Sequence, residues 1–572
     1  MSQKQSELKG ITYPLAEGFE INHEGVWFLI PQKEQVRRVF VCAPLYVLAY
    51  ARNERYENYS KLLTFCDPDG KVHEWLMPQE QLAGDGNEIR KTLLSMGLKI
   101  GEDRQAKDFL TRYLLSCHPT DRVRTVDRTG WHGQFYVLPE GPIGKQIGEK
   151  ILFLGPQIGN PIFHSTGTLE LWQTRIAARC VGNSRLIFSL SSAFAGPLLY
   201  ICQEENGGFH LIGISSTGKT TCLYVAASVF GEKDYIQRWK ATSNGIEAVA
   251  KMYNDLLLPL DEMGEISPKD AGEVAYMLGN GMGKGRADKN GEARNRAKFR
   301  CLFLSTGEIS LAQHMLEEGK KAKAGQETRI ADIPADQGPF GAFEFLHDSL
   351  DGHSFSNSIK EAARECHGIA GRLYIERLSE DFEIVKNAVE ATIDGFVEQY
   401  VPKGSSGQVK RVGRRFGLVA AGGELATYFG ITQWNKGVAT AAAGKCFMDW
   451  LERRGSDQDL EEKKIISKIQ HFFEMHGDSR FSSWHNGNDA KTYNRAGFKK
   501  TDGERVEYYV LEEVFKNEIC QGSDWKYAAQ LFVKKGYLMP STDGKSTRSE
   551  NLPGMGKLRC YRFQRIPVGK DE

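Results

Sequence analysis

One glycine-rich segment constrains the fold of this chain more than any other feature of its sequence. Gly213 to Thr220 reads GISSTGKT and fits the pattern G-x-x-x-x-G-K-[ST]. The apolar run Phe209–Gly213 predicts a strand before it, and Thr221–Phe230 predicts a helix after it. In that context a glycine loop turns backbone N–H groups towards phosphates at the positive end of a helix. The alternative is a glycine-rich turn with a surface lysine.

The loop therefore predicts a site for ATP and Mg²⁺. Lys219 would reach the β- and γ-phosphates, and the Thr220 hydroxyl would be a ligand of Mg²⁺. The residues expected to contact the nucleotide are Gly213, Ser215, Ser216, Thr217, Gly218, Lys219, Thr220 and Thr221.

A second strand ends in two carboxylates. Leu256–Leu260 is apolar, and Asp261 and Glu262 follow it directly. We expect Asp261 to hold Mg²⁺ together with Thr220, and Glu262 to polarise the attacking water. This pair favours hydrolysis over transfer of the phosphate to a substrate hydroxyl. The alternative is an apolar strand followed by a solvated acidic turn.

A third apolar strand, Arg300–Glu308, ends in polar residues. In the sheet of a nucleotide hydrolase it would lie between the first two strands, with Ser305 or Thr306 sensing the γ-phosphate. The alternative is an ordinary strand end.

Arg329 precedes the last predicted strand of this region. We expect it to act as an arginine finger in the site of a neighbouring subunit, where it would match charge that develops in the transition state. The alternative is a structural salt bridge, with Arg372 and Arg377 as other candidates for phosphate contact.

Between the second and third strands lies a strongly basic segment. Gly279–Arg300 carries seven basic and two acidic side chains, although the formal net charge of the chain is only +1. Lys-Asn-Gly at 289–291 is typical of a β-hairpin turn. A basic hairpin that leads into the third strand would bind DNA and respond to the γ-phosphate. The alternatives are that these side chains form a solvated surface, or that they neutralise the phosphates of the bound nucleotide. The residues predicted to contact DNA are Lys284, Arg286, Lys289, Arg294 and Arg296.

Several short motifs, spread over roughly residues 20 to 435, resemble the family catalogued as domain of unknown function 927. They are Asp67-Pro-Asp-Gly, Arg128-Thr-Gly-Trp131-His132-Gly, the 213–220 loop, Trp239-Lys-Ala-Thr242, Leu260-Asp261-Glu262, Gly283-Lys-Gly-Arg286, Ser305-Thr-Gly-Glu308, Gly325-Gln-Glu-Thr-Arg329 and Arg415-Phe-Gly-Leu-Val-Ala-Ala-Gly-Gly-Glu. The resemblance implies a helicase-like P-loop ATPase, similar to ring-forming superfamily-3 and AAA+ proteins, from a phage, plasmid or genomic-island replication module. Members of that family are often fused to a primase. This chain has no zinc ribbon and no room for a primase before residue 20, so we expect a separate primase or replication protein as partner.

The expected fold class is α/β, with an AAA+-like P-loop core built on a parallel sheet. The expected domains are a mixed α+β N-terminal domain at 1–165, the ATPase core at 166–340, a helical lid or continuation of the core at 341–435, and a C-terminal helical and winged-helix-like domain at 436–572. The basic stretch 403–415 is rich in Gly and Ser and is expected to be a loop or linker.

Two further segments carry weaker signals. Residues 523–572 hold ten basic and five acidic side chains, and their pattern resembles a recognition helix followed by a wing. This tail is expected to contact either duplex DNA or a protein partner. Trp131 and His132 are better explained by a packed turn than by chemistry.

Composition sets the remaining limits. The eleven Cys are scattered singly, and the N-terminus lacks an apolar signal core. The uncharged, mostly apolar run 186–202 is expected to be a buried helix and not a membrane span. We therefore expect a cytoplasmic ring oligomer, a hexamer, that moves along single-stranded DNA at the expense of ATP, with no membrane. The alternative is a non-helicase ATPase switch or remodeller; a P-loop kinase is disfavoured by Asp261-Glu262.

Overall fold

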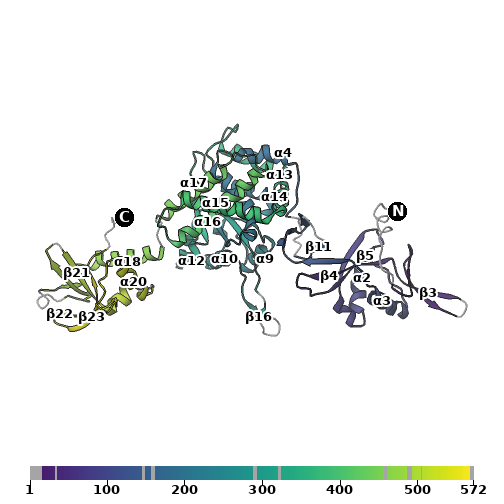
Figure 1. Ribbon diagram of the computed structural model, residues 1–572, viewed down its shortest axis with the longest axis horizontal. Helices are drawn as coiled ribbons and strands as arrows, with labels where there is room; N and C mark the ends of the chain where they lie inside the picture. Colours follow the sequence, from purple (N-terminus) through teal and green to yellow (C-terminus); the bar gives the residue numbers. More distant parts are fainter. Residues whose placement is uncertain are drawn as a thin grey trace. The chain divides into compact units, whose positions relative to one another are not determined.

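The computed structural model describes residues 16–32, 35–144, 148–155, 162–287, 293–294, 296–319, 324–455, 460–485, 492–503 and 505–566 (Figure 1). The chain divides into two compact units. Unit 1 comprises Met1–Ala322, Arg329–Phe396 and Arg415–Phe447, and unit 2 comprises Lys323–Thr328, Val397–Arg414 and Met448–Glu572. No helix in these described ranges is long and apolar enough to cross a membrane.

The N-terminal part of unit 1 is mostly β-structure. One antiparallel sheet is formed by β1 (Phe19–Ile21), β2 (Val26–Pro31) and β3 (Val36–Cys42). A mixed sheet has the order β11 (Lys150–Phe153), β7 (Arg122–Val126), β4 (Leu45–Asn53), β5 (Ser60–Cys66) and β6 (Val72–Pro78). A third contains β10 (Gly141–Ile143), β9 (Phe135–Leu138) and β8 (Gly130–His132). Helices α2 (Asn87–Ser95) and α3 (Arg104–Ser116) each contribute apolar side chains to a shared core with these strands.

The centre of unit 1 is a parallel five-stranded sheet. Its order is β13 (Gln237–Arg238), β14 (Leu256–Asp261), β17 (Cys301–Gly307), β12 (Gly207–Ile212) and β18 (Ile330–Pro334). Strands β12 and β17 are buried along their whole length, because helices cover both faces of a parallel sheet and its strands become continuously apolar. The prediction that the third strand lies between the first two is confirmed, since β17 separates β14 from β12.

Helices cover this sheet and bring distant segments to it. Helices α6 (Ser184–Ala195), α8 (Lys219–Ala227) and α10 (Pro268–Asn280) contact its strands. Helix α13 (Gly352–Glu365) packs on α8, and α9 (Ser243–Met252) packs on α10. Helix α6 is buried at every position, so the uncharged run is a buried helix as predicted. It ends before Gly196, where an added Cβ would lie 2.5 Å from the backbone of Leu256 at the start of β14.

Further helices follow between residues 369 and 454. They are α14 (Ile369–Glu380), α15 (Phe382–Tyr400), α16 (Gly407–Tyr428) and α17 (Val438–Arg454). The prediction of a loop or linker over 403–415 is wrong from Gly407 onward, because that part belongs to α16. Val409, Val412 and Phe416 are buried at helical spacing, and the basic residues between them obscured this short apolar pattern in the sequence.

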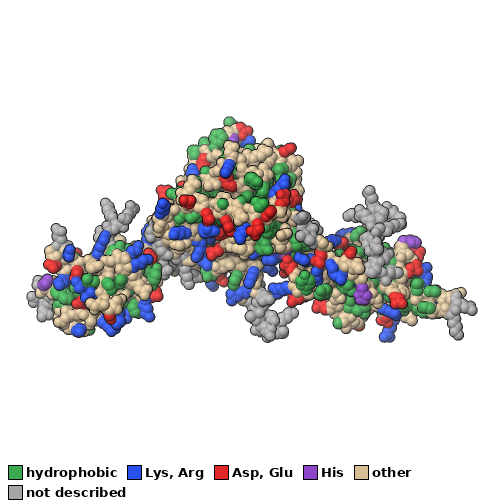
Figure 2. All heavy atoms as spheres, in the orientation of Figure 1, with side chains coloured by type: hydrophobic (Ala, Val, Ile, Leu, Met, Phe, Trp, Pro, Cys, Tyr) green, Lys and Arg blue, Asp and Glu red, His purple; other side chains and the backbone are tan. Residues whose placement is uncertain are grey.

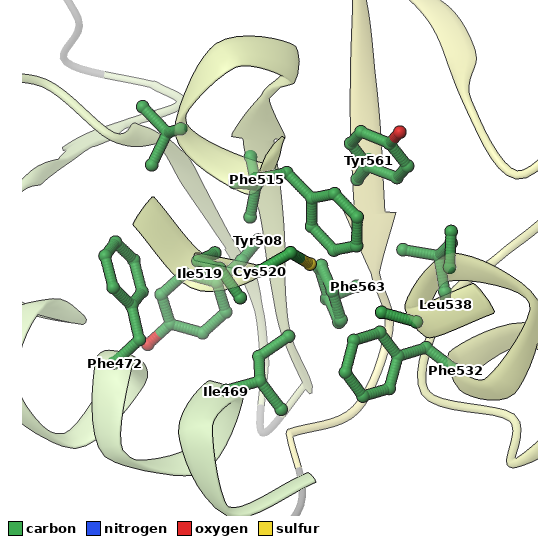
Figure 3. Close-up of a cluster of buried hydrophobic side chains, with 14 of the residues drawn as sticks. Ile469, Phe472, Tyr508, Phe515, Ile519, Cys520, Phe532, Leu538, Tyr561 and Phe563 are labelled. Atoms are coloured by element: carbon green, nitrogen blue, oxygen red, sulfur yellow. The ribbon is translucent and has the colours of Figure 1, made fainter. Parts of the chain in front are cut away.

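The C-terminal part of unit 2 packs three helical segments against one sheet. The sheet has the order β19 (Phe481–Ser483), β20 (Gly497–Asp502), β21 (Arg505–Leu511), β23 (Gly556–Phe563) and β22 (Arg548–Leu552). The helical segments are α18 (Leu460–His476), α19 (Glu512–Val514) continued by η6 (Phe515–Ile519), and α20 (Trp525–Lys534). Figure 3 shows their shared core, in which Phe472, Phe515, Phe532 and Phe563 come from different elements.

Candidate active site

The predicted strand, loop and helix around Gly213 are confirmed as elements. The glycine loop, Gly213–Gly218, joins β12 to α8, and Gly218 has the left-handed φ of +94° that glycine adopts most easily. Lys219 is the first residue of α8 and is buried. Its Nζ donates hydrogen bonds to the carbonyls of Gly213 at 2.8 Å and Ile214 at 2.6 Å. The lysine therefore lies over the loop, and burial lowers its pKa against the opposing effect of nearby carboxylates.

A cavity of about 490 Å³ opens at this loop, a volume in the range of small-ligand pockets. The predicted residues that line it are Ser215, Ser216, Thr217, Gly218, Lys219, Thr220, Thr221, Glu262 and Thr306. Asp261 adjoins this cavity through Thr220 and Thr306, and Gly213 adjoins it through Lys219. Apart from Arg329, the structure therefore brings the whole predicted nucleotide site together at the carboxyl edge of the parallel sheet.

Thr306 connects the Asp261 carboxylate to the Glu262 backbone. Its hydroxyl donates to Asp261 Oδ1 at 2.6 Å and accepts from the Glu262 backbone N–H at 3.2 Å. Thr220 Oγ1 lies 3.5 Å from the same Asp261 oxygen. Ser305 is fully buried and faces away, where it bonds Trp239 Nε1 at 2.8 Å and His210 Nδ1 at 2.9 Å. Of the two candidate sensors, Thr306 is therefore the one that faces the cavity.

Glu262 combines unusual backbone geometry with a perturbed carboxyl. Its φ of +56° is left-handed, a conformation that costs energy in a residue other than glycine and is often found at functional sites. Burial raises the pKa of this carboxyl, the charges of Asp261 and Glu308 raise it further, and Lys219 opposes them. A raised pKa brings a carboxylate closer to the operating pH, which makes it a better general base.

The residues at the end of β14 fit Mg²⁺. The Thr220 hydroxyl and the Asp261 carboxylate supply oxygen ligands close to each other, and Mg²⁺ is commonly held by one or two carboxylates together with substrate phosphates. When bound, the ion would neutralise phosphate charge. Among the described residues, no group of three or more His, Cys, Asp or Glu is arranged to hold a metal.

The segment after β18 covers the glycine loop, which sequence reasoning did not predict. Ala342 N donates to the Thr217 carbonyl at 2.7 Å. Gly341 has φ +75°, and an added Cβ would lie 2.5 Å from that same carbonyl oxygen. Phe343 packs so closely on Gly218 that a Cβ there would lie 2.6 Å from its ring. This segment therefore fixes the outer surface of the loop.

Helix α13 adds a further set of residues to the cavity. Ser356 and Thr221 share a hydroxyl hydrogen bond of 2.6 Å although they are 135 positions apart in sequence. The residues missed by sequence reasoning are Glu308, Phe340, Phe343, Gly352, His353, Ser356 and Lys360. Glu308 could have been found, because it ends the third strand; the others have no motif of their own.

Lys360 is the most informative of these missed residues. It lines the cavity from α13, and its Nζ lies 5.8 Å from the centre of the Tyr224 ring on α8. Burial lowers its pKa, while the Asp261 carboxylate opposes that shift. A second lysine therefore faces the region where phosphates would lie.

The predicted basic hairpin exists as a two-stranded ribbon that projects from unit 1 below α9 and α10 in Figure 1. Strands β15 (Arg286–Ala287) and β16 (Ala293–Arg294) are antiparallel, with Arg286 opposite Arg294. The turn with Lys289 lies outside the described residues. Figure 2 shows Lys and Arg side chains gathered around the base of the ribbon.

The base of the ribbon is held by protein groups. Gly283 approaches the Glu247 carboxylate so closely that an added Cβ would lie 2.5 Å from it, and Lys284 N donates to Glu247 at 3.3 Å. The Lys284 ammonium pairs with Glu273 at 2.9 Å, whereas Arg296 is exposed. Gly283 therefore allows a close approach between the base of the ribbon and Glu247.

The hairpin leads directly into a buried junction at the amino edge of the sheet. Arg300 Nε pairs with Asp255 Oδ1 at 2.7 Å, and Arg300 N donates to Asn254 Oδ1 at 2.9 Å. Asp255 is fully buried and also accepts from Trp131 N at 3.0 Å. Trp131 is buried in this packing, which confirms the interpretation of that motif as a packed turn.

Arg329 does not line the cavity. It precedes β18 and so lies at the amino edge of the sheet, opposite the edge that holds the glycine loop. Its Nε donates to Asn280 Oδ1 at 2.8 Å, and its guanidinium lies 4.3 Å from the centre of the Tyr276 ring. The alternative arginines are both in ion pairs, Arg372 with Glu140 and Arg377 with Glu380.

A parallel sheet with a glycine loop, a strand-end Asp-Glu pair and a facing hydroxyl is typical of nucleotide-binding α/β proteins. A family model described as "Domain of unknown function (DUF927)" matches residues 19–298, just under half of the chain. A search of the curated proteins finds no match.

A comparison with solved structures shows which known fold the chain is similar to. The SCCmec type IV Cch active helicase has a TM-score of 0.70 at 16% identity, over 96% of this chain and 98% of that one. The apo A form of the NrS-1 C-terminal region has a TM-score of 0.26 at 12% identity, over 62% of this chain and 77% of that one. This score is too low to indicate a shared fold. The chain therefore has a helicase-like fold.

Proposed function

We propose that the protein is a P-loop ATPase of the AAA+ type that hydrolyses ATP to move along single-stranded DNA, and that it works as a DNA helicase. The observation that carries this proposal is the connection between site and hairpin. Thr306, near the carboxyl end of β17, bonds the Asp261 carboxylate and the Glu262 backbone N–H. The same strand begins at Cys301, directly after Arg300, to which the basic ribbon leads.

The proposed reaction is attack of water on the γ-phosphorus of ATP. Glu262 accepts the proton of the water, the bond from the γ-phosphorus to the β-phosphate oxygen breaks, and ADP and phosphate leave. Lys219 and the backbone of the glycine loop hold the phosphates, with Lys360 as an additional cation. Thr220 and Asp261 would hold Mg²⁺, which lessens repulsion between the phosphates and the attacking oxygen.

In this proposal Thr306 couples ATP hydrolysis to movement of the DNA-binding ribbon. The Thr306 hydroxyl bonds the Asp261 carboxylate. We propose that a γ-phosphate competes for this hydroxyl, so that its release lets Thr306 return to Asp261. A shift at this end of β17 reaches the ribbon through Arg300, where the predicted contacts with the DNA backbone are Lys284, Arg286, Lys289, Arg294 and Arg296.

The proposed assembly is a ring of identical subunits, a hexamer. Arg329 lies at the amino edge of its own sheet, so it would act in the site of the next subunit and not in its own. The proposed setting is replication of a mobile genetic element in the cytoplasm, with a separate primase or replication protein.

The test is strand separation on a forked duplex by the full chain. Wild type with ATP and Mg²⁺ is expected to displace the strand. Glu262→Gln is expected to bind ATP without displacing it, and Lys219→Ala to lose ATP binding. Hydrolysis of ATP that is driven by a protein partner, with no displacement on any fork, would contradict the helicase function and favour a remodelling ATPase.

A further inference from the structure

The C-terminal part of unit 2 contains a helix–turn–helix followed by a strand hairpin. The first helical segment is Glu512–Ile519, a turn spans residues 520–524, and α20 follows. The Asp524 side chain begins α20 by accepting from Lys526 N at 2.8 Å. Strands β22 and β23 then form an antiparallel hairpin. In helix–turn–helix proteins the second helix is the one that enters the major groove of DNA.

Helix α20 has one buried face and one basic exposed face. Phe532 contacts Phe563 of β23 in the core, with ring centres 5.8 Å apart (Figure 3). On the opposite side Lys526, Gln530 and Lys534 are exposed at intervals of four residues, which places them in one stripe. No acidic residue occurs within α20. The stripe therefore offers two cations and an amide to a partner.

The strand hairpin adds basic residues on the same side of the sheet as α20. Tyr561 and Phe563 of β23 point into the core, where Tyr561 stacks on Phe515 at 3.8 Å. Because side chains of a strand alternate between faces, Arg559 and Lys557 share the face of Tyr561. Both are exposed.

The rest of the hairpin keeps this face free of carboxylates. Ser549 and Asn551 of β22 lie opposite Arg559 and Lys557 and are also exposed. Glu550 lies on the other face, where it pairs with Arg548 at 3.1 Å. We call α20 together with Lys557 and Arg559 the C-terminal basic face.

We propose that the C-terminal basic face binds duplex DNA. Lys526, Gln530 and Lys534 of α20 would enter the major groove, which is wide enough for an α-helix, and Lys557 and Arg559 would contact backbone phosphates. Charge complementarity carries this choice of partner, because α20 and the hairpin present cations and hydrogen-bonding groups on this face. The carboxylates beside it are engaged by protein groups, Asp524 by the α20 backbone and Glu462 by Tyr527 and Lys535. Lys and Arg side chains gather along the lower edge of this unit in Figure 2. The proposal concerns a second DNA site and does not depend on the ATP-driven function of unit 1.

The experiment measures binding of a blunt duplex to the full chain by fluorescence anisotropy without nucleotide. Lys526→Ala/Lys534→Ala and Lys557→Ala/Arg559→Ala are each expected to weaken duplex binding about tenfold and to reduce its dependence on salt, since each pair removes two cations from the contact with the polyanion. The matched control is Lys500→Ala/Arg505→Ala on the opposite face of the sheet, which is expected to leave binding unchanged.

Two further measurements separate base contacts from phosphate contacts and from loss of folding. Gln530→Ala is expected to leave the salt dependence unchanged and to reduce discrimination between duplex sequences, because an amide reads base edges and not phosphates. ATP hydrolysis by the α20 and hairpin variants is expected to equal that of wild type. Their circular dichroism spectra and melting profiles are also expected to equal those of wild type, which establishes that the C-terminal part folds. Duplex binding that all these variants retain, or that the control loses equally, would overturn the proposal and leave this face as a protein-docking surface.

Discussion

At the scale of single residues, the proposed hydrolysis of ATP depends most on Glu262. Its left-handed backbone, its contact with Thr306 and its raised pKa arise from its place directly after β14, among the carboxylates of Asp261 and Glu308. Sequence alone predicted its identity as the base, because Asp-Glu follows an apolar strand. It did not predict the influence of Glu308, which requires the two strand ends to be adjacent.

The pH dependence of hydrolysis follows from this carboxyl. The base must be ionised, so kcat/KM is expected to fall as the pH drops through a pKa that lies above the ordinary range of a glutamate. Glu308→Gln removes one neighbouring negative charge and is expected to move this acidic limb to lower pH. A pH profile of kcat/KM for phosphate release measures both. An acidic limb that Glu308→Gln leaves in place would contradict this account of Glu262.

Lys360 provides a separate prediction about nucleotide affinity. Since it faces the cavity beside Asp261, Lys360→Ala is expected to weaken ATP binding about tenfold or more, as loss of a hydrogen bond to a charged group does. Lys360→Arg retains the charge and is expected to recover part of the affinity. The measurement is titration with a fluorescent ATP analogue, with the exposed Lys233→Ala as control. Equal affinity of Lys360→Ala and wild type would exclude Lys360 from the phosphate site.

At the scale of elements, the order of strands was predictable and the elements around them were not. Each strand of the site is recognisable in the sequence as an apolar run that ends in polar residues. Parallel strands place those ends at one edge of the sheet. The segment after β18 that covers the glycine loop, and helix α13, show no comparable pattern in the sequence. Their contacts with the loop region, such as the bond between Ser356 of α13 and Thr221, join positions far apart in sequence and arise only from tertiary packing.

The start of α16 was mispredicted for a related reason. Glycine, serine and basic residues favour a loop in a local reading, and burial of Val409 and Val412 overrides that preference. The junction of Asp255, Arg300 and Trp131 was missed because it joins three segments whose sequences give no sign of contact.

That junction can be tested by stability. Arg300→Leu leaves the buried Asp255 carboxylate without its cation, and breaking a buried pair in this way costs about 3–5 kcal/mol. The melting temperature of the full chain is expected to fall by roughly 5 °C or more. Asp255→Asn/Arg300→Leu removes both charges and is expected to recover part of the loss. A single variant that melts like wild type would mean that this pair does not hold β14 and β17 together.

At the scale of the whole molecule, the account requires that subunits share each ATP site. Glu262 and Arg329 lie at opposite edges of one sheet, so the two residues that would act on one ATP must come from different subunits. The proposed ring therefore rests on where Arg329 lies, and not on the glycine loop.

Mixing two inactive variants tests this sharing. Glu262→Gln and Arg329→Ala are each expected to lose hydrolysis alone. When mixed in equal amounts before assembly, one subunit supplies Glu262 and its neighbour supplies Arg329, so about a quarter of the interfaces regain both. Phosphate release by the mixture measures the recovery, and differently tagged subunits establish that mixed oligomers form. Mixed oligomers without any recovery would contradict an arginine finger at Arg329.

The central claim is that the basic ribbon couples DNA to the ATP site, and phosphate release with and without single-stranded DNA tests it most directly. Wild type is expected to release phosphate faster when DNA is present. Arg286→Ala/Arg294→Ala, which neutralises the facing pair of the ribbon, is expected to lose that acceleration, whereas the control Lys233→Ala/Arg377→Ala keeps it. Hydrolysis by wild type that is indifferent to DNA, or acceleration that survives in the ribbon variant, would contradict the claim.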